Sequence, residues 1–378
     1  MSMWFIILLV ALILTALALF YLSCAVCRFY CFSHFIENRR MRKILVGGGI
    51  VLLSFACIWL VLGFANAIVC SIYFAMIWII TDIVFFFVRK IKKCTFKKYY
   101  AGGVAVALSV LSLSVGWFLD HHVWQTDYSL SSSKNIQPLK IAMFADAHLG
   151  TTFNAKGFAK HLSDIKASEP DLIIIAGDFV DDGTTKQEMI EAVKALGSIK
   201  MRCGIYFVHG NHDKGYYGGH RGFSVLDLEN ELRKNNIRVL KDEVVPIADN
   251  NFYLIGRRDY SVEKEQSGSR KAMKELVEEL DKNKYIIVVD HQPTDYQNQA
   301  EAGVDLVLSG HTHGGQLFPF NSVGKWIGAN ENIYGYERRK NTDFIVTSGI
   351  SDWAIKFKTG TKSEYVLIQL SKQKEQTD

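Results

Sequence analysis

Four long apolar stretches near the start of this 378-residue chain constrain its fold more than any other feature. Each is close to the roughly 20 residues that a helix needs to cross a bilayer. The first lacks the basic segment of a signal peptide and has no clear cleavage site, so it is expected to be retained. We therefore predict an all-α membrane region over residues 1–119, with spans at Trp4–Val26, Ile44–Ala65, Ala67–Val88 and Ala101–Leu119.

Charge divides the chain near the same point. Residues 1–119 hold eleven Lys and Arg but only Glu37 and Asp82 as acids, whereas the remainder holds 32 basic and 36 acidic residues. The formal charge of +5 thus comes from the membrane flanks, and no nucleic-acid partner is expected. The basic residues lie in two loops, Arg28–Lys43 and Arg89–Lys98, which the positive-inside rule places in the cytoplasm. Everything after Leu119 is then predicted to lie outside.

A polar stretch separates the membrane region from the rest of the chain. Residues 120–139 include Ser131, Ser132, Ser133 and Pro138 and show no periodicity, which is typical of a linker. We predict a third segment, residues 140–372, as a folded domain.

Short apolar runs in that domain end repeatedly in metal-ligating side chains. Such runs, rich in Ile and Val, indicate buried strands, and open α/β sheets build their sites at the carboxyl ends of strands. Neutral imidazole is the commonest side-chain metal ligand. The five runs and their followers are Lys140–Phe144 with Asp146 and His148, Leu172–Ala176 with Asp178, Ile205–Val208 with Asn211 and His212, Tyr285–Val289 with His291, and Asp305–Leu308 with His311 and His313. Their convergence predicts a metal centre.

Helical patterns alternate with these strands, which indicates an α/β domain. One helix carries Glu188 in its first turn after threonine caps, a capping-box arrangement. The helices are expected at Ala155–Ala167, Thr184–Leu196, Val225–Asn235 and Ser269–Asn283. Further strands without long helices between them predict a second, mixed sheet, with members at Val239–Ile247, Phe252–Ile255, Phe344–Thr347 and Tyr365–Leu370.

Over residues 138–370 the order of these motifs resembles the calcineurin-like metallophosphoesterases. The matching elements are Asp146-x-His148, Gly177-Asp178, Gly210-Asn211-His212-Asp213, His291 and Gly310-His311-x-His313. The Gly-His-Thr-His-Gly-Gly-Gln run from Gly310 is similar to the membrane-anchored bacterial subgroup. The resemblance implies a four-layer α/β fold, a β-sandwich flanked by helices, in a bacterial cell membrane. It does not cover the four membrane spans.

The resemblance also implies a ligand set for two divalent transition-metal ions, with Mn, Fe or Zn favoured and Ni or Co also compatible with mixed nitrogen and oxygen donors. One metal would be held by Asp146, His148, Asp178 and His313, and the other by Asp178, Asn211, His291 and His311. A metal-activated water would then hydrolyse a phosphate ester, phosphodiester or pyrophosphate. His212 corresponds to the family histidine that stabilises the transition state or protonates the leaving oxygen.

Three functions remain open from the sequence. The leading one is a membrane-anchored phosphoesterase acting outside the cytoplasm on a phosphorylated small molecule, lipid or envelope component, with the bilayer as its partner. The second keeps the chemistry but faces the cytoplasm, as a nucleotide or lipid-precursor pyrophosphatase. The third is a metal-bearing sensor module without turnover, which the complete ligand set and His212 disfavour.

Several further residues have two interpretations each. Arg257 and Arg258 are expected either to clamp a phosphate or to form a surface pair. Asp181 and Asp290 are expected to orient metal ligands, and Asp213 to cap its turn. Four aromatic residues are expected either to line an apolar substrate groove or to pack in the core, namely Phe318, Phe320, Trp326 and Trp353.

Overall fold

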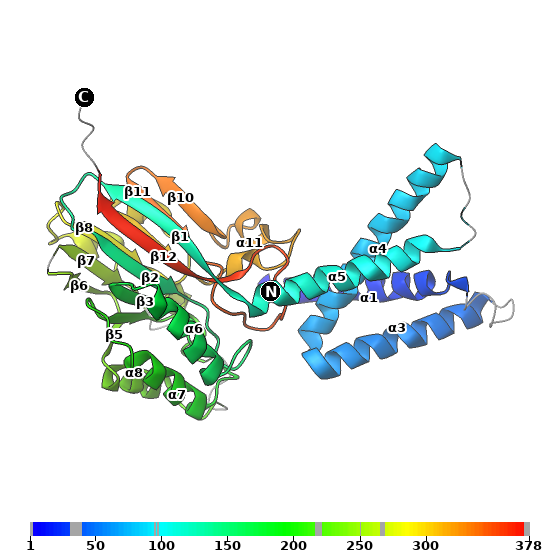
Figure 1. Ribbon diagram of the computed structural model, residues 1–378, viewed down its shortest axis with the longest axis horizontal. Helices are drawn as coiled ribbons and strands as arrows, with labels where there is room; N and C mark the ends of the chain where they lie inside the picture. The colour runs from blue at the N-terminus through cyan, green and yellow to red at the C-terminus, as the bar shows by residue number, and fades with distance from the viewer. Residues whose placement is uncertain are drawn as a thin grey trace. The chain divides into compact units, whose positions relative to one another are not determined.

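The computed structural model divides into two compact units (Figure 1). The first comprises Met1–Trp117 with Ala354–Lys356, and the second Phe118–Trp353 with Phe357–Asp378. The structure describes residues 3–30, 40–93, 96, 98–215, 221–249, 251–264 and 269–373. Parts of both predicted basic loops, residues 31–39, 94, 95 and 97, lie outside the described residues.

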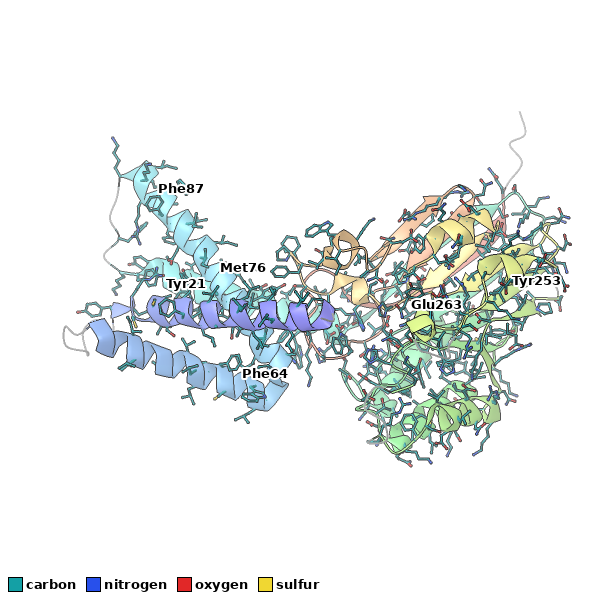
Figure 2. All side chains as sticks on the ribbon, turned by 180° about the vertical axis from the view of Figure 1, so that it is seen from behind. Tyr21, Phe64, Met76, Phe87, Tyr253 and Glu263 are labelled. Atoms are coloured by element: carbon teal, nitrogen blue, oxygen red, sulfur yellow. The ribbon has the colours of Figure 1, made fainter. Side chains whose placement is uncertain are left out.

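Four helices of the first unit are long and apolar enough to cross a membrane, in agreement with the predicted spans. Gly63, with a φ of 94°, separates the second of these helices from the third. The chain therefore turns at Gly63, and Asn66 already lies in the helix that follows. In Figure 2, Phe64 and Phe87 mark the beginning and the far part of one helix, α4. The helices are α1 (Met3–Val26), α3 (Arg40–Leu62), α4 (Phe64–Lys92) and α5 (Tyr100–His121).

A polar cluster joins three segments of the first unit. The Asp82 carboxylate accepts hydrogen bonds from the hydroxyls of Tyr21 and Tyr99, both at 2.7 Å, and from the guanidinium of Arg28. The indole Nε1 of Trp78 donates to the Tyr99 hydroxyl at 2.7 Å. The one acidic residue within the predicted spans is thus held by three donors from elsewhere in the unit.

The second unit contains two six-stranded sheets (Figure 1). The first sheet has the order β1-β12-β2-β3-β4-β5, and β2 to β5 run parallel. The second has the order β10-β11-β9-β8-β7-β6, and β11, β9, β8 and β7 run parallel. The strands are β1 (Val123–Ser132), β2 (Leu139–Phe144), β3 (Leu172–Ala176), β4 (Ile205–Val208), β5 (Ile237–Leu240), β6 (Glu243–Ile247), β7 (Phe252–Gly256), β8 (Tyr285–Val289), β9 (Leu306–Ser309), β10 (Gly335–Arg339), β11 (Thr342–Val346) and β12 (Ser363–Lys372).

Three apolar cores show that the layers follow the order helix, sheet, sheet, helix. One core joins the first sheet to α6 (Ala155–Ala167), α7 (Lys186–Gly197) and α8 (Val225–Lys234). The central core lies between the sheets, where Ile141 and Ile174 of the first meet Leu254 and Ile287 of the second. The third joins the outer face of the second sheet to α9 (Met273–Val277) and α10 (Tyr296–Glu301). This confirms the predicted α/β sandwich flanked by helices.

The helix starts follow the predicted capping chemistry. The Asn154 side chain accepts from the backbone N–H of Gly157 at the start of α6. Thr185 and Glu188 form a complete capping box at α7. The expected helix over Ser269–Asn283 was too long, because only Met273–Val277 is α-helical. Short elements complete the chain: η1 (Tyr260–Lys264), η2 (His313–Gly315) and α11 (Val323–Trp326).

The expected irregular linker over residues 120–139 was wrong. Val123–Ser132 forms β1, which pairs in parallel with β12 from Val123 opposite Ser363 to Ser132 opposite Lys372. Exposure alternates along β1: Thr126, Tyr128 and Leu130 are half-buried, whereas Gln125, Asp127 and Ser129 face solvent. The alternation is the strand signal in this polar stretch. The second unit, which begins at Phe118, includes the whole segment assigned to a linker.

Candidate metal centre

The candidate ligands lie just beyond the carboxyl ends of five strands. Asp146 and His148 follow β2, and Asp178 and Asn211 follow β3 and β4, all in the first sheet. The other three follow strands of the second sheet: His291 follows β8, and His311 and His313 follow β9. The predicted convergence thus occurs, but at an edge shared by two sheets rather than along one.

The backbone at these positions is unusual. Five of the seven candidate ligands have positive φ, a region that residues other than glycine seldom occupy. Such strain persists where surrounding contacts over-determine it and is concentrated at functional sites. The five are Asp146 (56°), His148 (35°), Asp178 (52°), His311 (72°) and His313 (48°). The chain therefore turns sharply as each of these strands ends.

One cluster consists of Asp146, His148 and His313, each offering a ligand atom within 4.8 Å of the others. The Nε2 atom of His313 lies 3.9 Å from Oδ1 of Asp146. The Nε2 atom of His148 lies 3.7 Å from Oδ2 of Asp178. This cluster thus adjoins Asp178.

A second cluster consists of Asp178, His291 and His311, again within 4.8 Å. Here the Nε2 atom of His291 lies 3.1 Å from Oδ2 of Asp178. The same carboxylate oxygen therefore faces His148 of the first cluster and His291 of the second. Asp178 occupies the position between the two clusters that a bridging ligand requires.

Close backbone packing holds Asp178 in place. Its Oδ1 atom accepts the backbone N–H of His212 at 2.8 Å. A Cβ atom at Gly210 would lie 2.1 Å from that oxygen, so only glycine fits there. The backbone on both sides of Asn211 thus lies close to the Asp178 carboxylate. Asn211 itself is buried. The structure thus brings Asn211 and Asp178 to the same edge.

Second partners fix the orientation of the rings. The Nδ1 atom of His291 donates to the carbonyl of Ala176 at 2.7 Å. The Nδ1 atom of His313 lies 2.9 Å from Oδ1 of Asp352. Metal-binding histidines commonly use one ring nitrogen in this way and present the other to the ion. In both rings the Nε2 atom faces a candidate carboxylate ligand.

The donor set fits divalent transition metals. Nε2 of His148 and Nε2 of His291 are buried, and neither has a hydrogen-bond partner among the described residues. Burial lowers the pKa of His311 and of His313 to about 3, so these imidazoles are neutral, the form that binds metals. Burial alone would raise the pKa of Asp178, but His291 and His148 outweigh it and hold that pKa well below its ordinary value. Burial alone would lower the pKa of His291, but the charge of Asp178 raises that pKa well above its ordinary value, so His291 must release a proton when it binds a metal. Imidazole and carboxylate donors together suit transition metals.

Comparison with known proteins assigns the family. Residues 139–315 match the model of the calcineurin-like phosphoesterase family. This part of the chain belongs to that family. A metallophosphoesterase from Helicobacter pylori is 33% identical over 239 residues, which cover 61% of this chain and 60% of the relative. A Bos taurus "transmembrane protein with metallophosphoesterase domain" is 29% identical over 238 residues, covering 61% of this chain and 52% of that protein.

The chain thus spans about 60% of the length of the bacterial relative and about half of the bovine one. Among solved structures, a Haemophilus influenzae NAD nucleotidase aligns with a TM-score of 0.36 and 15% identity, over 58% of this chain and 52% of its own.

His212 lies at the edge of the phosphoesterase centre. Its Nδ1 atom is 3.0 Å from Oδ1 of Asp181, whose other oxygen lies 3.4 Å from Nδ1 of His148. Burial alone would lower the pKa of His212, but the hydrogen bond to Asp181 and the charge of Asp178 raise it. Asp181 therefore contacts two histidines of the site, as expected for a residue that orients ligands.

Asp213 organises the loops around Asp178. Its buried carboxylate accepts the backbone N–H groups of Asp178, Phe179, Val180 and Gly210 at 2.7–3.1 Å. It therefore holds the turns after β3 and β4 together, a wider role than the expected cap of a single turn.

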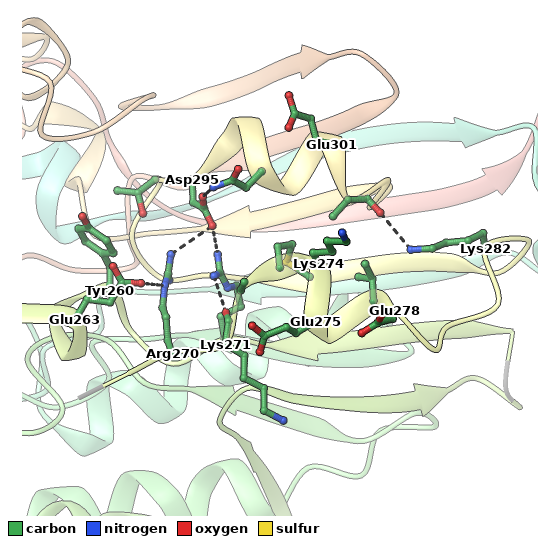
Figure 3. A pocket seen from close by; sticks show the side chains of 17 residues that line it. Tyr260, Glu263, Arg270, Lys271, Lys274, Glu275, Glu278, Lys282, Asp295 and Glu301 are labelled. Atoms are coloured by element: carbon green, nitrogen blue, oxygen red, sulfur yellow. Dashed lines mark hydrogen bonds and ion pairs between the residues drawn. The ribbon is translucent and has the colours of Figure 1, made fainter. Parts of the chain in front are cut away.

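The interpretation of Arg257 as part of a surface pair was wrong. Its side chain is 2% exposed and pairs with Asp290 at 3.0 Å and Asp295 at 2.7 Å. Arg270 pairs with the same two carboxylates and with Glu263, beside a cavity of about 890 Å³ (Figure 3). Asp290 thus pairs with two arginines and does not contact a ring nitrogen of His291 in this network. Arg258 donates to the carbonyl of Ser269 on the surface.

Four aromatic residues of the phosphoesterase domain are exposed, so they do not pack in the core. Trp326 is 75% exposed, and Phe318, Phe320 and Trp353 are between 42% and 60% exposed. The Trp353 ring lies 5.8 Å from that of His212. The Trp353 ring therefore presents an apolar surface beside the candidate centre.

Sequence reasoning missed Asp352. It is fully buried, contacts His313 and lies 3.8 Å from the ammonium of Lys358. Lys358 is also fully buried and donates to the carbonyl of Ser348 at 2.7 Å. The available signal was the position of Asp352 shortly after the apolar run that ends at Thr347, the same pattern that marked the other strands.

Proposed function

We propose that this protein is a membrane-anchored phosphoesterase with two metal ions at the edge shared by its sheets. The observation that carries the proposal is the position of Asp178 between two clusters of imidazoles. Of the candidate ligands, a carboxylate at that position is suited to span two cations about 3.5–4 Å apart. The family assignment of residues 139–315 supports the same chemistry.

The proposed ligands follow from the two clusters. Asp146, His148 and His313 hold one ion, His291, His311 and Asn211 hold the other, and Asp178 serves both. When bound, two divalent cations activate water for in-line attack on phosphorus and neutralise charge on the phosphoryl oxygens. Mn, Fe or Zn are the proposed ions, because imidazole and carboxylate together select this group over Ca.

His212 is the proposed proton donor to the leaving oxygen. Asp181 orients the ring of His212 through its Nδ1 atom at 3.0 Å. Its raised pKa keeps a larger fraction of the imidazole protonated near neutral pH, as general acid catalysis requires.

The proposed substrate is an amphiphilic phosphate compound, such as a lipid pyrophosphate or a phosphorylated envelope component. The support is the exposed Trp353 ring beside His212 and the three other exposed aromatic residues of the same domain. Tryptophan combines apolar area with a polar N–H and is enriched at membrane interfaces. A phosphorylated small molecule is the broader class to which this substrate belongs.

The proposed orientation places the phosphoesterase domain outside the cytoplasm. Both basic loops of residues 1–119 then face inward, which the positive-inside rule favours. Four candidate spans precede the domain, and an even number returns the chain to the side of its N-terminus. A cytoplasm-facing pyrophosphatase is the outcome if the loops prove to lie outside.

A substrate panel tests this function. The full chain, purified in detergent, is assayed with phosphomonoesters, phosphodiesters, nucleotides and lipid pyrophosphates, with and without Mn²⁺. We expect Mn²⁺-dependent release of phosphate that is fastest with a lipid substrate. Absence of metal-dependent hydrolysis of any phosphate compound would instead support the sensor interpretation. Cysteines placed singly in each loop and labelled from outside intact cells decide the orientation.

A further inference from the structure

A short segment, Ala354–Lys356, belongs to the first unit, although the residues on both sides of it belong to the second. The chain thus enters the first unit after Trp353 and leaves it again before Phe357. The segment lies in neither a helix nor a strand. Its backbone N–H and C=O groups therefore need partners outside regular secondary structure.

The side chain of Asn66 supplies two of these partners. Its Nδ2 atom donates to the carbonyl of Ala354 at 3.0 Å, and its Oδ1 atom accepts the backbone N–H of Lys356 at 2.8 Å. The same Nδ2 atom donates to the carbonyl of Leu62, the last residue of α3, at 2.8 Å. Both N–H donors of the amide are then used. One side chain therefore joins the segment to the start of α4.

Asn66 differs from the other polar residues of its helix. It is buried in α4, which is apolar enough to cross a membrane, and an amide without partners is costly in such surroundings. The buried hydroxyls of Ser71 and Thr81 donate to carbonyls four residues earlier in the same helix. The Asn66 amide instead bonds to a carbonyl 288 residues later in the chain. This difference indicates that Asn66 serves the segment and not only its own helix.

The residues that flank the segment lie in the phosphoesterase domain. Before it, the ring of Trp353 lies 5.8 Å from that of His212. After it, the buried ammonium of Lys358 donates to the carbonyl of Ser351 at 3.2 Å, which holds the two ends of this loop together. Trp353 thus lies between the fixed base of the loop and the segment that Asn66 holds.

We propose that Asn66, at the start of the third candidate span, is a positioning residue for Trp353 and acts through the segment Ala354–Lys356. This inference rests on the proposed function, because that function assigns Trp353 to the apolar part of the substrate. The span is then more than an anchor, since its first turn holds the loop that carries a substrate-binding ring. Loss of the Asn66 amide frees the segment, loosens the Trp353 ring and weakens binding of an amphiphilic phosphate compound.

Hydrogen–deuterium exchange of the full chain in detergent tests the contact, because the Lys356 N–H is one of the bonded groups. In Asn66→Ala this amide should exchange about three- to tenfold faster, the effect of losing one hydrogen bond. Ser71→Ala, which removes a buried hydroxyl from the same helix, is the matched control and should exchange like the parent. Unchanged exchange at Lys356 in Asn66→Ala would overturn the inference.

Steady-state kinetics test the positioning of Trp353. With Mn²⁺ and farnesyl pyrophosphate, Asn66→Ala should raise KM about threefold while kcat and the bound Mn²⁺ remain those of the parent. The KM for nitrophenyl phosphate, which has no lipid chain, should not change. In a Trp353→Ala background the same substitution should add nothing, because residues that act through one contact are not additive. A further threefold rise in that background, or no rise with Trp353 present, would overturn the inference.

A variant of the segment itself decides if Asn66→Ala does not fold. Lys356→Pro removes the N–H that Asn66 accepts and leaves α4 intact, because proline has no backbone donor. Lys356→Ala keeps that N–H and is its control. The proline variant should show the threefold rise in KM and the alanine variant the KM of the parent, whereas equal KM values would overturn the inference. A parent without metal-dependent turnover would overturn the proposed function, and exchange at Lys356 would then decide alone whether Asn66 holds the segment.

Discussion

Two polar clusters of this protein contrast in how their groups are satisfied. In the first unit, the Asp82 carboxylate receives donors from Tyr21, Tyr99 and Arg28, and Trp78 donates to Tyr99. At the sheet edge of the second unit, ring nitrogens face the Asp178 carboxylate without a hydrogen bond among the described residues. The first cluster satisfies its own polar groups, and the second has ligand atoms directed at a common space.

The contrast shows why similar residue types have different consequences. The half-buried Asp82 carboxylate is compensated by its three donors, and these contacts join helices. Buried imidazole nitrogens without partners are costly unless another group binds them. The cost is consistent with a site whose stability comes from cations rather than from the protein alone. Substitutions in the two clusters should therefore affect different observables.

The largest expected effect is at Asp178. Asp178→Asn should reduce phosphate release by more than about a thousandfold, since loss of an outer partner alone costs about 10–100-fold. Both ions depend on this carboxylate, so the bound metal measured by mass spectrometry should also fall. Wild-type activity in this variant would place the metal chemistry elsewhere. Asp164→Asn, at an exposed carboxylate of α6, is the matched control.

The next effect is at His212. His212→Ala should lower kcat by about 10²–10⁴-fold while both ions remain bound. The loss should be greatest with poor leaving groups, which need a proton, and smaller with nitrophenyl esters. Comparable losses for good and poor leaving groups would rule out proton donation.

A smaller effect is expected at Trp353. Trp353→Ala should raise KM for a lipid pyrophosphate about tenfold, because burial of an aromatic ring contributes a few kcal/mol at most. The KM for a small soluble ester should not change. Equal changes for both substrates would show that the ring supports His212 and does not bind an apolar group. Trp353→Phe, which keeps an aromatic surface, is the control.

The smallest effect is in the membrane cluster. Asp82→Asn should lower the free energy of unfolding of the helices by about 0.5–2 kcal/mol, the range of single polar contacts between membrane helices. Thermal unfolding in detergent measures the loss, and kcat should remain that of the parent. A large fall in kcat with unchanged stability would mean that this cluster also serves the reaction. Tyr21→Phe, which removes one donor, should show a smaller change.

Local patterns predicted the strands that carry the site. The runs that became β3, β4 and β8 have the expected bounds, because continuous Ile and Val suit a strand buried on both faces. The polar β1 was missed, since its alternation between half-buried and exposed residues is weak. The predicted strand Val239–Ile247 is split between β5 and β6, and Asp242, with a φ of 53°, lies between them.

Contacts between distant segments could not be predicted in the same way. In the sequence, Arg257 has no evident partner for its charge. Its partners in the structure, Asp290 and Asp295, come from a segment more than 30 residues away. The contact of Asp352 with His313 likewise joins two loops. Motif order indicated which residues meet at the sheet edge, whereas the residues that support them depend on tertiary packing.

The measurement that tests the central claim most directly is the metal content of the full chain. The purified protein is stripped with a chelator, incubated with Mn²⁺, freed of excess ion and analysed by mass spectrometry together with a phosphate-release assay. The account predicts two ions per chain and activity that returns as they bind. Full activity in the stripped protein, or fewer than two ions at saturation, would contradict it.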